Sequence, residues 1–120
     1  MNLNNFTIKS QEAVQQAQQI AQGLEHQQIE NAHIFKGIME VDENVTPFLI
    51  QKLGVNFGIL QQTTEHILKG FPKVTGGEQM LSKTASETLL EATSLAKKMK
   101  DEYIAVEHLL LAMVKSKDSI

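Results

Sequence analysis

Two stretches of the chain carry apolar or small residues at every third and fourth position, which is the spacing of one face of an α-helix. The face opposite the first of these stripes consists largely of glutamines, so that helix is predicted to lie at the surface with one side in the core. The stripe positions are Ala13, Ala17, Ile20 and Leu24 in the first stretch and Thr88, Ala92, Leu95 and Met99 in the second.

Both stretches belong to a longer duplication, in which residues 10–40 align without a gap with residues 85–115, 75 residues further on. After a loop, each copy continues into a shorter helix, predicted over about residues 31–41 and 106–115. The pattern predicts an all-α fold in which one helix–loop–helix unit is doubled, with pseudo-twofold symmetry, into one compact bundle. Five aligned pairs are identical: Glu12 and Glu87, Ala17 and Ala92, Ala21 and Ala96, Ile29 and Ile104, and His33 and His108.

Capping residues indicate where the helices begin. Thr7 and Ser82 precede the two long helices, where a hydroxyl accepts a hydrogen bond from an otherwise unsatisfied amide. Between the copies, Thr46 followed by Pro47 and, further on, Asn56 are predicted to start two more helices. The short helices of the two copies are expected to bury Ile34, Phe35 and Ile38, and Leu109, Leu110, Met113 and Val114.

Turn-forming residues separate the two copies. Pro72 and the pair Gly76-Gly77 are typical of an extended connector. We therefore expect one domain over residues 1–120, with a first repeat over about 6–70, a connector over 71–80 and a second repeat over about 81–120.

Composition excludes several classes of function. The 120 residues have a formal net charge of −3, which gives no electrostatic reason to bind nucleic acid. Without cysteine there is neither a disulfide framework nor a thiolate metal site, and a reducing cytosol is compatible. No apolar run is long enough to span a bilayer or to form a secretory signal. We therefore expect a cytoplasmic protein that does not enter a membrane.

The four histidines are the main candidates for site chemistry. His33 and His108 occupy equivalent positions of the duplication but lack the spacing that places two metal ligands on one helix face. They are expected to bond to the backbone near their helix starts, whereas His26 and His66 are expected to face solvent. No phosphate-binding loop and no fixed nucleophile–base pair is recognisable. The sequence therefore predicts no metal, no cofactor and no catalysis by this chain.

Ordered motifs along the chain resemble those of a known family. The pattern FT…A…A…A…I…H in the first copy and YIAVEHLLLAM in the second is similar to the double repeat of the Clp amino-terminal domain. The start NLNNFT, the segment IQKLGVN and the connector FPKVTGG favour the branch of the ClpB disaggregases. The resemblance implies an all-α domain at the amino terminus of a ring-forming AAA+ ATPase. Because this chain has no ATPase motif, we interpret it as one domain of a longer protein.

The resemblance also implies a substrate-binding site. Its polar members match positions that ClpB-like domains use to engage substrates, and its apolar members are expected to line a groove beside them. Ordinary structural roles compete with this interpretation, since a carboxylate in a first helical turn complements the helix dipole and Leu95 aligns with a core stripe. Ala105 replaces a serine cap that the family often has, and Glu91 makes the expected groove more polar. The expected site residues are Thr7, Asp101 and Glu107, with Leu95, Tyr103 and Leu110.

The resulting hypothesis is a monomeric domain that captures unfolded or aggregated polypeptide and passes it to its own AAA+ ring. Two alternatives stay open. One is a domain that docks folded adaptor proteins on a Clp protease-associated unfoldase. The other is a stand-alone enzyme or metal protein.

Overall fold

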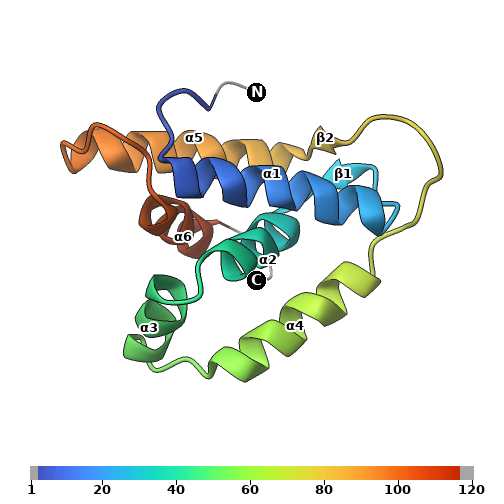
Figure 1. Cartoon of the computed structure of the whole chain (residues 1–120), viewed down its shortest axis with the longest axis horizontal. Helices are drawn as coiled ribbons and strands as arrows, with labels where there is room; N and C mark the ends of the chain where they lie inside the picture. The colour runs from blue at the N-terminus through green and yellow to red at the C-terminus, as the bar shows by residue number, and fades with distance from the viewer. Residues whose placement is uncertain (1–2, 117–120) are drawn as a thin grey trace.

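A computed structural model describes residues 3–116, and within that range the chain forms six α-helices and two very short strands (Figure 1). This outcome confirms the predicted all-α class. In chain order the elements are α1 (Ile8–Gly23), β1 (Gln28–Ile29), α2 (Asn31–Val41), α3 (Val45–Lys52), α4 (Phe57–Lys69), β2 (Met80–Leu81), α5 (Lys83–Lys98) and α6 (Val106–Lys115).

Helix α2 lies at the centre of the bundle. It packs against α1 along its length and is also contacted by α3, α4, α5 and α6. Its apolar side chains are accordingly buried, as the sequence predicted for Ile34, Phe35 and Ile38. Helix α6 is its counterpart in the second copy and packs chiefly against α5, with further contacts to α1 and α2.

A glycine allows α1 and α2 to approach closely. A Cβ built on Gly37 would lie 2.4 Å from the carbonyl oxygen of Ala13 and 3.1 Å from the backbone nitrogen of Ala17. The alanine stripe of α1 faces this contact and is fully buried. In the second copy, Ala112 occupies the position of Gly37 and Thr88 that of Ala13, so α5 and α6 meet through side chains.

The duplication extends to the backbone of the loops. Glu25 and Lys100 both adopt the left-handed conformation, with φ of 61° and 59°, at the ends of α1 and α5. The amide of the next residue, His26 or Asp101, then donates to the carbonyl of Ala21 or Ala96 respectively. This geometry ends α1 and α5 in the same way and turns the backbone of each copy toward its second helix, α2 or α6.

Parallel pairing of short segments joins the two copies. Strands β1 and β2 pair Ile29 with Leu81, and an isolated bridge pairs Ile104 with Phe6. These two pairs are related by the same 75-residue shift, since Phe6 corresponds to Leu81 and Ile29 to Ile104. The entry to each long helix is thus fastened to the loop of the other copy.

Most of the predicted helix starts are confirmed. The side chains of Thr7, Asn56 and Ser82 accept hydrogen bonds from the amides of Ser10, Ile59 and Ala85. The prediction that Thr46 caps α3 is wrong, because this helix begins at Val45. Thr46 is instead fully buried and donates from both its amide and its hydroxyl to the carboxylate of Asp42.

Some predicted core positions are also wrong. Val114 was expected to be buried but is 75% exposed, and Met99 at the end of the second stripe is 54% exposed. Leu110 and Met113 are only partly buried against the core. The periodicity identified the apolar face of α6, but this face extends beyond the neighbours that α6 contacts.

Replacing Asp42 is expected to destabilise the start of α3. Its carboxylate accepts bonds from the amides of Asn44, Val45 and Thr46 and from the Thr46 hydroxyl. Burial alone would raise the pKa of Asp42, but these bonds outweigh it and lower the pKa below 3.8. Asp42→Ala should cost about 1–3 kcal/mol, measured by urea unfolding at neutral pH. An unchanged unfolding midpoint would show that α3 is held by packing alone.

Candidate functional site

The loop between α5 and α6 is organised around His108. The Ala105 amide donates to His108 Nδ1 across 2.8 Å, which satisfies the backbone amide of the residue that precedes α6. Because Nδ1 accepts this bond, the ring proton of the neutral imidazole lies on Nε2. Nε2 then donates to the Asp101 carboxylate, also across 2.8 Å. His108 is itself buried, so this pair fixes the loop to the first turn of the helix.

The first copy repeats this arrangement with a different partner. The Glu30 amide donates to His33 Nδ1 across 2.8 Å, and His33 Nε2 donates to Nδ1 of His26, the residue that corresponds to Asp101. The expectation that His33 and His108 bond to the backbone is confirmed. The expectation that His26 faces solvent is wrong, since its side chain is 4% exposed.

An aromatic contact from the connector covers the histidine pair. The Phe71 ring lies edge-on to His26 and tilted against His33, with both pairs of ring centroids 5.5 Å apart. Burial lowers the pKa of His33 to about 4, and the neighbouring His26 and Lys36 add to this effect. Burial and then Lys73 lower the pKa of His26 as well. The pair is therefore neutral at pH 7.

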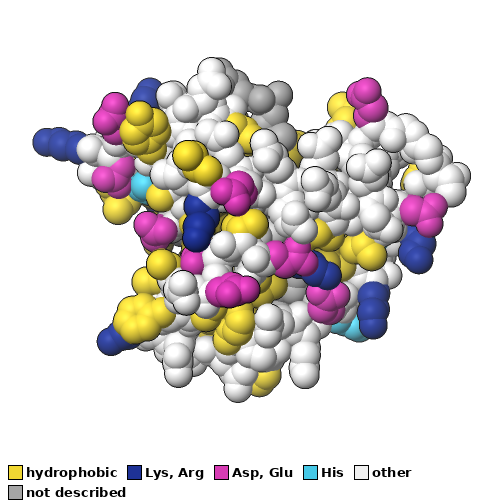
Figure 2. Space-filling view, viewed as in Figure 1, with side chains coloured by type: hydrophobic (Ala, Val, Ile, Leu, Met, Phe, Trp, Pro, Cys, Tyr) yellow, Lys and Arg dark blue, Asp and Glu magenta, His cyan; other side chains and the backbone are white. Residues whose placement is uncertain are grey.

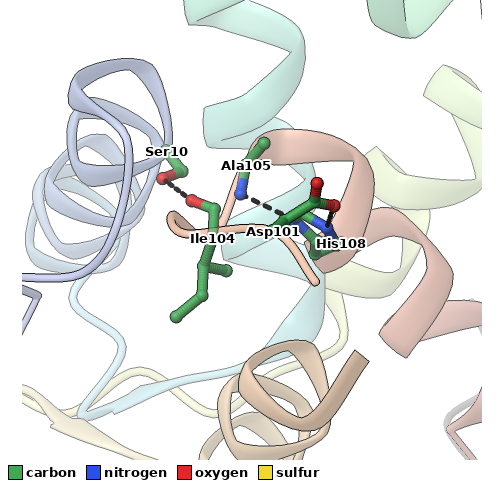
Figure 3. A network of polar contacts seen from close by, with 5 residues as sticks. All are labelled: Ser10, Asp101, Ile104, Ala105 and His108. Atoms are coloured by element: carbon green, nitrogen blue, oxygen red, sulfur yellow. Dashed lines mark hydrogen bonds and ion pairs between the residues drawn. The ribbon is translucent and has the colours of Figure 1, made fainter. Parts of the chain in front are cut away.

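A second set of bonds ties the α5–α6 loop to the start of α1 (Figure 3). The Ser10 hydroxyl donates to the Ile104 carbonyl across 2.7 Å, and the Thr7 amide donates to the same oxygen. The Thr7 hydroxyl in turn donates to the Ser10 oxygen. Ser10 is fully buried, so Thr7 is held beside the loop that carries Asp101.

The structure brings four of the six predicted site residues to this loop. Thr7 lies beside Ile104, Asp101 begins the loop with 47% of its side chain exposed, and Glu107 is exposed in the first turn of α6. Tyr103 projects from the loop and is 51% exposed.

The other two residues take part in packing. Leu95 and Leu110 are partly buried and pack against the hydrophobic core. They extend the surface of the core rather than line a deep hollow. A hollow of about 880 Å³ does lie between the end of α4 and helices α5 and α6, but none of the six residues lines it.

The sequence did not single out Ser10, and it assigned His108 a bond to the backbone but not its bond to Asp101. Ser10 and His108 are both buried and hold the exposed members in place. In both copies the residue that bonds to the second histidine nitrogen lies seven positions before the histidine, as His26 does before His33 and Asp101 before His108. This common spacing was the signal in the sequence. No group of three or more histidine, cysteine or acidic side chains within residues 3–116 could hold a metal ion. In the same range, no helix is long and apolar enough to cross a membrane.

Duplicated helices and matched loops define the class of a small helical repeat domain. The chain belongs to the Clp repeat (R) N-terminal domain family, whose model matches residues 5–120. The chain is 48% identical over 120 residues to the chaperone protein ClpB of Bacteroides thetaiotaomicron. The match includes the whole of this chain but only 14% of the length of that protein.

Solved structures agree on the fold. The N-terminal domain of Hsp104 from Candida albicans superposes with a TM-score of 0.86 at 20% identity, over 95% of this chain and 76% of that one. A ClpV N-domain in complex with a VipB peptide superposes with a TM-score of 0.77 at 14% identity, over 96% of this chain and 73% of that one. At these identities the likeness shows the fold alone.

Proposed function

We propose that the chain is the substrate-capturing domain of a cytoplasmic, ClpB-type AAA+ chaperone and that it binds unfolded or aggregated polypeptide around the α5–α6 loop. The observation that carries the proposal is a rim in which Asp101, Tyr103 and Glu107 are exposed and Thr7 is half-buried beside them. The loop that carries this rim is held by buried His108, through Asp101, and by buried Ser10, through Ile104. Such a surface binds without reorganising. The solved ClpV N-domain of the same fold is in complex with a VipB peptide, which supports peptide binding as a use of this fold.

The chemistry of the rim suits weak capture. An aromatic ring and partly buried leucines offer apolar contact at about 25 cal/mol per Å² buried, while association costs about 4–15 kcal/mol. The net affinity for a client segment should therefore be micromolar to millimolar. Weak binding matches a domain that has to release its client to a motor, and several copies on one ring would add avidity.

The test is a titration of the chain with a permanently unfolded protein, reduced and carboxymethylated α-lactalbumin, followed by fluorescence anisotropy. Glu107→Gln removes a charge from the rim and should weaken binding by about two- to fivefold. Asp101→Asn should do the same, because its amide oxygen still accepts the proton of His108 and preserves the loop. Tyr103→Ala should weaken binding further, since it removes the exposed ring.

Glu12→Gln is the matched control, because Glu12 is an exposed carboxylate on α1. Thr7→Ser keeps the capping hydroxyl and should retain stability. Unchanged client binding by the Asp101, Tyr103 and Glu107 variants, with melting temperatures preserved, would refute the site. Binding of a folded adaptor but of no unfolded client would favour the adaptor-docking alternative.

A further inference from the structure

A hollow of about 340 Å³ lies between the connector and the loop that joins α1 to α2. The connector arches from the end of α4 to β2, which pairs with β1 in that loop (Figure 1). Two bonds fasten it there, since the Val74 amide donates to the Glu25 carbonyl and the Met80 amide donates to the Gln27 carbonyl. We call this space the connector hollow; its lining shares no residue with the proposed client rim.

His26 presents a hydrogen-bond donor without a partner to the connector hollow. Its Nδ1 accepts the proton of His33 Nε2, so the proton of the neutral His26 ring lies on Nε2. No described residue accepts a hydrogen bond from this N–H. Within residues 3–116, Asn31 Oδ1 is the one fully buried side-chain polar atom without a partner, so His26 Nε2 is still reached from outside, although His26 is only 4% exposed. Because His26 lines the hollow, its Nε2–H is a fixed donor there.

Most of the remaining lining is apolar. The ring of Phe71 packs edge-on against His26 and helps to hold it in place. Met80 is 67% exposed and Val74 42% exposed, so apolar surface at the mouth is open to a ligand. The apolar side chains that line the hollow are those of Phe71, Pro72, Val74, Met80 and Leu81.

The charges around the hollow favour neither sign of ligand. Glu30 lines it, whereas Lys73 lies near enough to add to the effect of burial, which lowers the pKa of His26. On the connector side of the molecule, basic and acidic side chains lie next to one another at the surface (Figure 2). A neutral acceptor beside an apolar group therefore fits the hollow better than an ion does.

Strand β1 offers a second set of hydrogen-bonding groups. The amides of Met80 and Ser82 donate to the carbonyls on either side of Gln28. Because successive residues of a strand direct their backbone groups to opposite edges, the amide and carbonyl of Gln28 point away from β2. Gln28 is exposed and lines the hollow, so an extended peptide can pair with this edge.

We propose that the connector hollow binds one apolar residue of an extended, uncharged peptide segment, which accepts the proton of His26 Nε2 with a backbone carbonyl and pairs with the backbone of Gln28. A volume of about 340 Å³ lies at the lower end of the range of about 300–1,000 Å³ for ligand sites, which suits a single residue with its flanking peptide groups. In the second copy Asp101 replaces His26 and offers no donor, so the site belongs to the first copy alone. The inference goes beyond the proposed function, because it assigns a peptide site to the copy that does not carry the client rim.

The test is a titration of the ¹⁵N-labelled chain with the blocked tripeptide acetyl-Gly-Leu-Gly-amide at neutral pH. We expect shifts of the backbone amide signals of residues 26–30 and 71–81, and of the Nε2 signal of His26 as its hydrogen bond forms. Replacing the leucine of the probe by lysine, aspartate or glycine should weaken binding about tenfold, since the apolar contact is lost.

Two variants of the chain separate the donor from the apolar contact. His26→Asp removes the donor but still accepts the proton of His33, as Asp101 does from His108, and should weaken binding about three- to tenfold. Met80→Ala should weaken it about two- to fivefold. Met99→Ala is the matched control, because Met99 is 54% exposed at the end of α5 and does not line the hollow. Both methionines are exposed, so these variants should remain folded.

Several results would overturn the proposal. These are no shifts along residues 26–30 and 71–81 at millimolar probe, unchanged affinity in both His26→Asp and Met80→Ala, and shifts confined to the α5–α6 loop, which would place the peptide on the client rim. Equal affinity for the tripeptide and for acetyl-leucine methylamide would assign the hollow to small apolar amides instead of a peptide chain. Failure of α-lactalbumin binding, with the tripeptide still bound in the hollow, would remove the proposed client function and leave this inference standing.

Discussion

Gly37→Ala should unfold or severely destabilise the protein. The added methyl group would lie 2.4 Å from the Ala13 carbonyl oxygen, and both this atom and the nearby Ala17 nitrogen belong to the backbone of α1. Neither can move unless the two helices separate along the contact that buries the alanine stripe. Overpacking of this kind costs about 3 kcal/mol or more, which outweighs the gain of about 1 kcal/mol in helix propensity. Urea unfolding followed by circular dichroism measures the loss.

Gly23→Ala is the matched control for this prediction. Gly23 ends α1, and a Cβ built on it would meet nothing within 4 Å. The same substitution should therefore leave stability unchanged or raise it by up to about 1 kcal/mol. If Gly37→Ala unfolds at the same urea concentration as Gly23→Ala, then α1 and α2 do not pack as closely as the structure shows.

Local signals along the sequence predicted the helices well. The stripe of alanines, the caps Thr7 and Ser82 and the duplication located the starts of α1 and α5 and both ends of α2 and α6, because these features act within one turn of the chain. The start of α3 was missed because the capping group, Asp42, precedes a stronger-looking signal at Thr46 and Pro47.

Features that depend on distant neighbours could not be predicted in the same way. His26 is buried because His33 binds its Nδ1 and Phe71, 45 residues further on, covers the ring. The position of Val114 on an apolar face was clear, but periodicity does not say whether another element covers that face. Thr7, Asp101 and Glu107, which the family resemblance singled out, lie around one loop, but the pairing of Ile104 with Phe6 that brings them together is visible only in the fold.

Acidification should destabilise the first copy through its histidine pair. The pKa of His33 is about 4 in the folded chain against 6.5 for an exposed histidine, so the unfolded chain binds more protons between these values. The contribution to stability is complete above pH 6.5 and is lost as the pH falls toward 4. At about 1.4 kcal/mol per pH unit the loss from His33 amounts to about 3 kcal/mol, and His26 shifts in the same direction.

The geometry explains why a proton is costly at this point. A proton added to His33 Nδ1 would face the Glu30 amide, and one added to His26 Nδ1 would face the proton on His33 Nε2. The surrounding charges are Lys36 on α2 and Lys73 on the connector, and both oppose a further positive charge. Glu25 and Glu30 are the acidic residues nearest along the chain. The pKa of Asp42 lies below 3.8, so protonation of its carboxylate affects stability at a lower pH than the histidine pair does.

The second copy supplies the control that decides this prediction. His26→Asp gives His33 the carboxylate partner that His108 already has, so a proton on His33 would be compensated and the slope between pH 6.5 and 4.5 should flatten. Urea unfolding of both proteins at pH 7.5, 6.5, 5.5 and 4.5 gives the two slopes, and the Cε1 proton signal of His33 reports its titration directly. A His33 that titrates near 6.5 in the unaltered chain, or equal slopes for the two proteins, would show that the buried pair does not set the response to acid.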